Sequence, residues 1–197
     1  MNIIMLYMTI EFEATFIDVN VEEVRKKLRS IGAKLIYPER LMTRVVFFPP
    51  KTIKGGWMRV RDEGDKITLS LKQVDGDKIE DQKEICFNID DFDQGCQFLE
   101  AIGAKKKSFQ ETKRELWNYD DIEICIDTWP GLDPYVEIES DSEDKVKKVS
   151  ALLGFDFTKA IFGAADVIYE MKLGIPPDVI NNQTPEITFQ NPPLKQI

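Results

Sequence analysis

A repeated order of predicted elements is the feature that most restricts the fold of this chain. Each half of the sequence is predicted to contain one strand, one helix and three further strands. The two helices end in similar segments, Ile31-Gly32-Ala33-Lys34 and Ile102-Gly103-Ala104-Lys105, in which a glycine follows the last helical turn. Such helix ends are common by themselves, but together with the repeated element order they favour an internal duplication.

The strands are predicted from residues that alternate between polar and apolar. In the first strand, Glu11 and Glu13 alternate with Phe12, Ala14 and Phe16. Turns rich in glycine, proline and aspartate separate several of the later runs. The predicted strands are residues 8–17, 34–48, 56–62, 66–74, 81–89, 105–117, 122–128 and 134–140.

Four helices are predicted from capping residues and from the spacing of apolar side chains. The first begins after Asn20, where Glu23 completes a capping box, and it ends at Gly32. The second begins at Asp90 or Asp91 and ends at Gly103. The third is predicted over residues 142–154 and the fourth over residues 158–173.

Eight mostly antiparallel strands in two similar halves predict an α+β protein built on a closed β-barrel, because closure leaves no exposed strand edge. The helices are expected to flank this barrel. We expect residues 1–155 to form the barrel domain. Residues 156–197 are expected to form a C-terminal helical appendage and a proline-rich tail, packed on the barrel or trailing from it.

Several strands carry charge at every second position, so that like charges lie on one face. For any single strand, this pattern is typical of a solvated outer surface. However, acids and bases are segregated by strand, and like-charged neighbours are costly unless a counter-ion joins them. Acidic groups bind a divalent metal and basic groups a polyanion, so the whole set favours a charged interior that binds a metal–triphosphate complex. The charges concerned are Glu11, Glu13, Arg59, Arg61, Lys72, Arg114, Asp127, Glu137 and Glu139.

The composition excludes several classes of site. The 197 residues include no histidine, which removes Ser-His and Cys-His nucleophiles, histidine bases and most zinc sites. The formal net charge of −9 disfavours non-specific binding to nucleic acid or to an anionic membrane. The apolar opening, residues 1–10, is too short for a membrane span and lacks the basic start of a signal peptide, so we expect a cytoplasmic protein.

Five short motifs follow one another along residues 8–155. They are Glu11-Phe12-Glu13, Trp57-Met58-Arg59-Val60-Arg61, Thr68-Leu69-Ser70-Leu71-Lys72, Lys113-Arg114-Glu115 with the later Ile126-Asp127, and Tyr135-Val136-Glu137-Ile138-Glu139. The first resembles an acidic first-strand signature, usually written ExExK. In this order and spacing, the motifs resemble those of the CYTH, or triphosphate tunnel metalloenzyme, family.

The resemblance implies an eight-stranded tunnel that opens to solvent at both ends and binds a small-molecule triphosphate. Family members include class IV adenylate cyclases and thiamine, inorganic and RNA triphosphatases. The implied ligands of one or two Mg²⁺ or Mn²⁺ ions are Glu11, Glu13, Asp127, Glu137 and Glu139. The implied triphosphate-binding residues are Arg59, Arg61, Lys72 and Arg114, which together with Glu11 and Glu13 form the expected catalytic set. Glu84 matches a further acidic position of the second half.

One position departs from the family pattern, because Thr15 stands where the ExExK lysine is expected. The family lysine supplies a cation inside the tunnel. We hypothesise that Arg44 points inward and replaces it as a substrate-binding residue.

Three functions remain open at this point. Metal-dependent hydrolysis of an organic or inorganic triphosphate is favoured over cyclisation, because water is always available whereas cyclisation needs a positioned ribose. The alternatives are a class IV-type adenylate cyclase, which makes cyclic AMP and pyrophosphate from ATP, and a non-catalytic triphosphate- or nucleotide-binding module. Either a monomer or a homodimer is compatible with the sequence.

Overall fold

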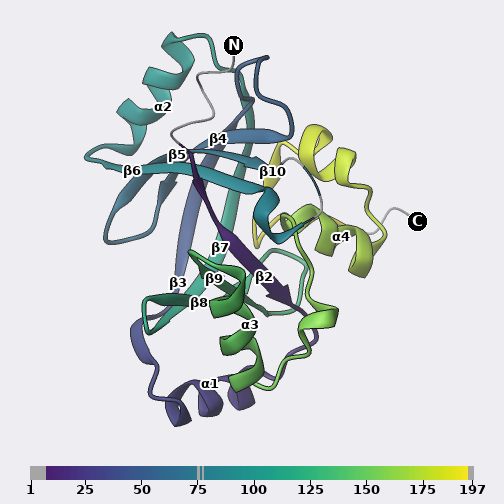
Figure 1. Ribbon diagram of the computed structural model, residues 1–197. Helices are drawn as coiled ribbons and strands as arrows, with labels where there is room; N and C mark the ends of the chain where they lie inside the picture. The colour runs from purple at the N-terminus through teal and green to yellow at the C-terminus, as the bar shows by residue number, and fades with distance from the viewer. Residues whose placement is uncertain (1–7, 75, 77, 195–197) are drawn as a thin grey trace.

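The computed structural model describes residues 8–74, 76 and 78–194 (Figure 1). Residues 1–7, on which part of the N-terminal expectation rests, lie outside these ranges. The strands are β1 (Thr9–Ile10), β2 (Phe12–Phe16), β3 (Lys34–Phe47), β4 (Gly56–Asp62), β5 (Ile67–Val74), β6 (Gln82–Ile89), β7 (Lys106–Tyr119), β8 (Ile122–Thr128), β9 (Tyr135–Ser140) and β10 (Glu186–Ile187). The helices are α1 (Val21–Ser30), α2 (Phe92–Ala101), α3 (Glu143–Leu152) and α4 (Ala165–Leu173), with short helical turns η2 (Ile79–Asp81), η3 (Phe157–Lys159) and η4 (Val179–Gln183).

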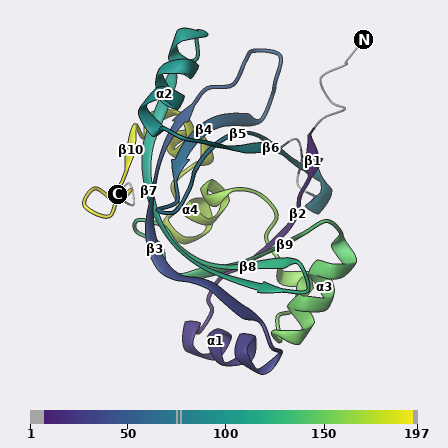
Figure 2. The same cartoon turned by 90° about the vertical axis from the view of Figure 1, so that its left-hand side faces the viewer.

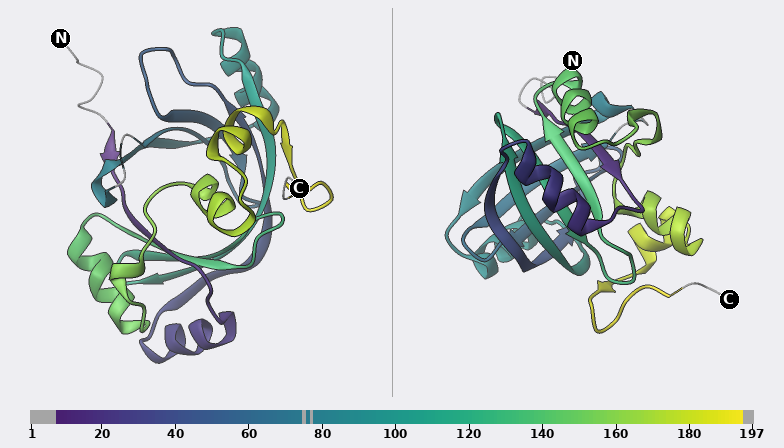
Figure 3. Two further views of the ribbon diagram at one scale, coloured as in Figure 1. Left: turned by 90° about the vertical axis from the view of Figure 1, so that its right-hand side faces the viewer. Right: turned by 90° about the horizontal axis from the view of Figure 1, so that it is seen from below.

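The sheet closes on itself through the N-terminal strand. Its order is β1-β6-β5-β4-β3-β7-β8-β9-β2, and all neighbours on this path are antiparallel. β1 and β2 are consecutive parts of one strand, so its first part pairs with β6 and its second part with β9. At the break between them, the Glu11 backbone N–H donates to the Gln82 carbonyl over 3.0 Å. Counted as one strand, β1 and β2 make an eight-stranded α+β barrel, which confirms the predicted fold class (Figures 2 and 3).

The helices cover the outside of the barrel and bury its apolar face. α1 and α3 pack on β2, β8 and β9 through Val24 and Leu28 of α1 and Val146 and Val149 of α3. α2 packs on β4, and Gly95 permits close approach: a Cβ atom there would lie 3.3 Å from the Val60 side chain of β4 and 2.4 Å from the Ile89 side chain of β6. Because the apolar residues of each strand face outward under the helices, the alternate residues face the interior.

The C-terminal segment contributes to the barrel wall. β8 pairs with β7 only from Lys113 onward, whereas β10 pairs in parallel with β7 at Phe109 and Gln110. Ile187 of β10 is fully buried. The last strand therefore covers the part of β7 that β8 does not reach.

The helical predictions are confirmed except for the start of the fourth. Asn20 and Asp91 cap their helices by accepting hydrogen bonds from the backbone N–H groups three residues later. The fourth helix was expected from residue 158, but α4 begins only at Ala165. The intervening Ile161 instead pairs with Thr15 of β2 through two backbone hydrogen bonds of 3.0 and 2.9 Å. This pairing holds the chain extended, so tertiary structure overrides the local helical preference. No helix in the described part of the chain is both long and apolar enough to span a membrane.

Candidate functional site

The interior of the barrel holds a cavity of about 380 Å³ lined by charged side chains. These side chains come from alternate positions of the strands, such as Arg59 and Arg61 of β4 and Glu137 and Glu139 of β9. The basic residues on the wall are Arg44, Arg59, Arg61, Lys66, Lys72, Lys107 and Arg114. The acidic residues are Glu13, Glu63, Glu84, Glu123, Asp127, Glu137, Glu139 and Asp166.

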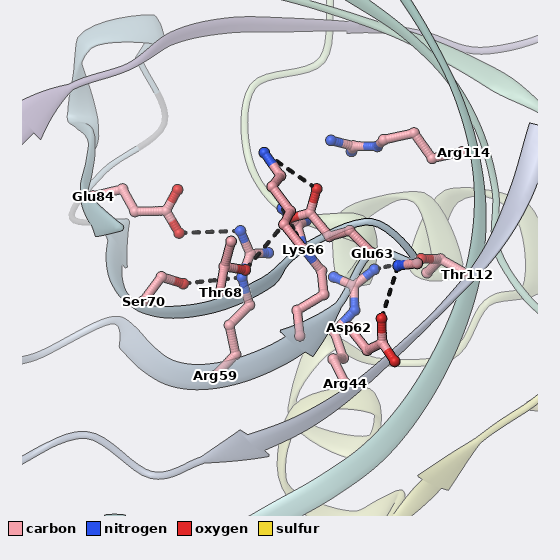
Figure 4. Close-up of polar contacts among 12 residues, drawn as sticks. Arg44, Arg59, Asp62, Glu63, Lys66, Thr68, Ser70, Glu84, Thr112 and Arg114 are labelled. Atoms are coloured by element: carbon pink, nitrogen blue, oxygen red, sulfur yellow. Dashed lines mark hydrogen bonds and ion pairs between the residues drawn. The ribbon is translucent and has the colours of Figure 1, made fainter. Parts of the chain in front are cut away.

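Two arginines of β4 are held by carboxylates on neighbouring strands and turns. The Arg59 guanidinium donates to Glu84 Oε1 over 3.1 Å and to Ser70 Oγ over 3.0 Å (Figure 4). The Arg61 guanidinium donates from two nitrogens to one oxygen of Glu63, which also accepts from the Thr68 hydroxyl. Burial and repulsion from Arg59 lower the pKa of Arg61, and the Glu63 carboxylate opposes this effect. Both guanidiniums are therefore fixed in orientation within the cavity wall.

Arg114 connects two acids of the second half. It donates to both oxygens of Asp127, over 2.7 and 2.5 Å, and to Glu137 Oε2 over 2.7 Å. Burial acts to lower the pKa of Arg114, but the Asp127 and Glu137 carboxylates outweigh it and raise the pKa. Burial and the nearby Asp127 carboxylate raise the pKa of Glu137 well above its usual range.

Three carboxylates form a compact group, which we call the acidic triad: Glu11, Glu13 and Glu139. One oxygen of each lies within 4.8 Å of the others. Lys72 lies beside them, with its Nζ 3.1 Å from Glu11 and 3.0 Å from Glu13. Burial raises the pKa of Glu11 to about 8 and that of Glu139 to about 6, against the opposing effect of Lys72. When all three are ionised, the carboxylates of the acidic triad carry more negative charge than one lysine balances. Their hard oxygen donors are those that Mg²⁺ and Mn²⁺ prefer.

Arg44 is the arginine of the cavity with the fewest partners in the described part of the chain. Its Nη2 donates to the Thr112 hydroxyl over 2.6 Å, and its guanidinium lies 4.8 Å from the Trp129 ring centre. Its Nε is buried without a hydrogen-bond partner there. Burial lowers the pKa of Arg44 well below its usual value, and repulsion from Arg59, Arg61 and Arg114 adds to this effect. An anion bound near Arg44 would relieve this accumulation of positive charge.

The structure brings the sequence-predicted site residues together around one cavity. Arg44 points inward, as hypothesised, and Thr15 is buried in the wall beside Ile161. Glu11 is connected to the residues of the cavity wall through its ion pair with Lys72 and through its place in the acidic triad. The predicted residues on the cavity wall are Glu13, Arg44, Arg59, Arg61, Lys72, Glu84, Arg114, Asp127, Glu137 and Glu139.

Two contributors were missed by the sequence analysis. Glu63 was assigned to a turn, although it continues the alternation of Arg59 and Arg61 and lies only 3% exposed on the cavity wall. The second contributor is the C-terminal segment, which was predicted only as a helical appendage and a tail. It lies across one end of the barrel, where Asp166 and Asn181 line the cavity and bond to each other (Figure 3). The resemblance implied a tunnel open at both ends, so this covered end is a difference from that expectation.

Several solved structures share this fold. A conserved hypothetical protein from Pyrococcus furiosus is 20% identical, with 76% of this chain and 94% of that chain covered and a TM-score of 0.63. A candidate adenylate cyclase from Vibrio parahaemolyticus is 14% identical, with 82% and 98% covered and a TM-score of 0.69. A candidate adenylyl cyclase from Hippeastrum, for which a dominant triphosphatase activity is described, is 13% identical, with 87% and 99% covered and a TM-score of 0.51.

The sequence comparison identifies the family more directly than these structural likenesses do. No curated protein matches the sequence. The profile described as the CYTH domain, however, matches residues 11–160, which include β2 to β9 and the whole acidic triad. This chain therefore belongs to the CYTH family.

Proposed function

We propose that this protein binds a small-molecule triphosphate together with Mg²⁺ or Mn²⁺ in the barrel cavity and hydrolyses it. The observation that carries the proposal is the meeting of four arginines and the acidic triad around one buried cavity. Guanidinium groups bind phosphate oxygens through paired hydrogen bonds, and carboxylates bind hard divalent ions. We also propose a cytoplasmic location and a monomer or homodimer.

The charge of the cavity supports a metal-dependent activity. Seven basic and eight acidic side chains line it, so its formal charge is −1 before any ligand enters. A triphosphate carries several negative charges and would be repelled by an acidic wall on its own. Divalent ions that enter with the triphosphate would remove this repulsion and satisfy the acidic triad at the same time.

We assign the roles of the wall residues as follows. Arg44, Arg59, Arg61 and Arg114 bind the phosphate oxygens and stabilise the charge that develops on them during transfer. Lys72 is expected to leave the acidic triad for the triphosphate when a metal binds there. The residues that would hold the metal are Glu11, Glu13, Asp127, Glu137 and Glu139. Asp127 and Glu137 would be available to it if Arg114 bound the triphosphate instead.

The proposed reaction is hydrolysis at the terminal phosphorus. A bound divalent ion neutralises phosphate charge and makes water a better nucleophile, so the site needs no histidine base. Water attacks the terminal phosphorus, and the bond between this phosphorus and the bridging oxygen breaks. Orthophosphate, the diphosphate product and a proton are released. In the cyclase alternative, the ribose 3′-hydroxyl of ATP attacks the innermost phosphorus and pyrophosphate leaves.

The test is to incubate purified protein with Mg²⁺ or Mn²⁺ and inorganic triphosphate, ATP or thiamine triphosphate, and to separate the products by ion-exchange chromatography. Orthophosphate release that requires metal and is lost in the double variant Glu137→Gln, Glu139→Gln supports the proposal. Glu143→Gln is the matched control, because Glu143 pairs with Lys147 on the exposed face of α3. Cyclic AMP with pyrophosphate would identify a cyclase instead, and binding without turnover would identify a non-catalytic module.

A further inference from the structure

Three buried hydrogen-bond donors on the cavity wall lack partners within the described residues. They are Arg44 Nε, Gln82 Nε2 and the Tyr135 hydroxyl. Buried polar groups in folded proteins are almost always paired, because an unpaired one loses its hydration without compensation. Since all three donors belong to residues that line one cavity, an acceptor-rich ligand in that cavity would supply the missing partner. Phosphate oxygens meet this description.

Tyr135 is the new residue in this set. It is the first residue of β9, lies opposite Asp127 of β8, and is 1% exposed. Its ring belongs to the apolar cluster that includes Ile168 and Tyr169 of α4. This packing fixes the ring, while the residue also lines the cavity beneath the C-terminal segment. The hydroxyl is therefore positioned by the same segment that covers this end of the barrel.

The Trp129 side chain connects Tyr135 with Arg44. Trp129 packs on the apolar cluster that contains the Tyr135 ring, and the Arg44 guanidinium lies 4.8 Å from the Trp129 ring centre. Tyr135 and Arg44 also line the same cavity. A neutral phenol beside a buried guanidinium supplies two donors to a phosphate oxygen without adding charge.

We propose that the Tyr135 hydroxyl and Arg44 together bind one phosphoryl group of the triphosphate at the end of the cavity that the C-terminal segment covers. This inference rests on the proposed function and adds a binding residue to it. A purely structural role is disfavoured by comparison with the neighbouring Tyr169. Its hydroxyl donates to the Pro130 carbonyl over 2.7 Å, whereas the Tyr135 hydroxyl has no such bond within the described residues.

The experiment compares Tyr135→Phe with Tyr169→Phe. Both variants remove one hydroxyl and keep a ring in the same apolar cluster. The dissociation constant of a non-hydrolysable triphosphate analogue with Mg²⁺ is measured by calorimetry, because the wild type is expected to hydrolyse triphosphate itself. Thermal unfolding is followed without ligand. Tyr135→Phe should weaken binding by about tenfold, as expected for one hydrogen bond to a charged oxygen, without lowering the Tm. Tyr169→Phe should lower the Tm and change the dissociation constant by less than about twofold.

The outcomes separate this inference from the function on which it rests. If the wild type binds triphosphate and Tyr135→Phe binds equally well, the assignment of Tyr135 is wrong and the proposed function stands. A fall in the Tm of Tyr135→Phe as large as that of Tyr169→Phe would show a structural partner for the hydroxyl and would also overturn the assignment. If the wild type binds no triphosphate with either metal, both proposals are wrong.

Discussion

Glu139 allows a sharp test of the acidic triad. Neutralising its carboxylate is expected to stabilise the protein without metal and to destabilise it, relative to the wild type, when metal is present. Burial raises the pKa of Glu139 from 4.5 to about 6, the Glu13 carboxylate adds to the effect, and Lys72 opposes it. A carboxyl group with a higher pKa in the folded state stabilises the fold while it is protonated, and this stability is lost as the pH rises through the folded value. The shift of the Glu139 pKa from 4.5 to about 6 therefore lowers the free energy of unfolding above pH 7 by about 2 kcal/mol, relative to a protonated carboxyl.

The variant Glu139→Gln mimics the protonated carboxyl at every pH. In EDTA at pH 7.5, we therefore expect it to be more stable than the wild type by about 2 kcal/mol. At pH 5, where the wild-type carboxyl is mostly protonated in the folded state, the gain should fall below about 1 kcal/mol. Urea unfolding followed by circular dichroism at the two pH values measures both quantities. Glu143→Gln, with its partner Lys147 exposed on α3, should change stability by less than about 0.5 kcal/mol.

Addition of Mg²⁺ or Mn²⁺ should make the wild type more stable than Glu139→Gln. Metal binding to the folded state stabilises the wild type in proportion to the logarithm of the metal concentration, and the variant lacks one of the three carboxylates that form the site. The reasoning is refuted if Glu139→Gln is less stable than the wild type in EDTA at pH 7.5. It is also refuted if the metal stabilises the variant as much as the wild type.

Three further perturbations test other parts of the cavity. Arg114→Ala leaves the buried Asp127 and the partly buried Glu137 without their cation and should lower stability by about 3–5 kcal/mol in urea unfolding. Lys113→Ala, at a half-exposed position, should lower it by less than about 0.5 kcal/mol. Glu63→Gln removes a negative charge beside Arg61 and should lower the stability of the protein without ligand by about 2 kcal/mol. Inorganic triphosphate should nevertheless raise the Tm of this variant more than the Tm of the wild type. A chain that ends at Thr184 lacks β10 and should lose about 3 kcal/mol of stability, measured in the same way, because one buried isoleucine and the pairing with β7 are removed.

The barrel and most of its charged interior were predictable because strand residues alternate. Once Phe12 and Ala14 are assigned to the apolar face, Glu11 and Glu13 necessarily occupy the other face. Alternation alone does not show which face points into the barrel. The segregation of acids and bases on different strands indicates that it is the charged face. That segregation is stable only where the opposite charges meet across a closed interior, as Lys72 and Glu13 do here.

The missed features depend on contacts between distant parts of the chain. The segment before α4 includes Lys159 and Ala160, which favour helices, but Ile161 forms hydrogen bonds with Thr15, which local propensity cannot reveal. Glu63 follows a strand and precedes Gly64, so turn chemistry concealed its inward orientation. Tyr135 resembles any apolar strand residue. Only the structure shows that it lines the cavity and that its buried hydroxyl has no partner within the described residues.

The N-terminal strand that joins the two edges of the sheet also determines when folding can finish. This strand is synthesised first, yet Phe12 pairs with Ser140 of β9, and β10 is added later still. During translation the partial sheet therefore has two unpaired edges, which are templates for association with other chains. Contacts between such distant residues also slow folding, because a long loop must close before they form. We expect barrel closure to be a late and slow step, which exposes the nascent chain to aggregation until β9 has left the ribosome.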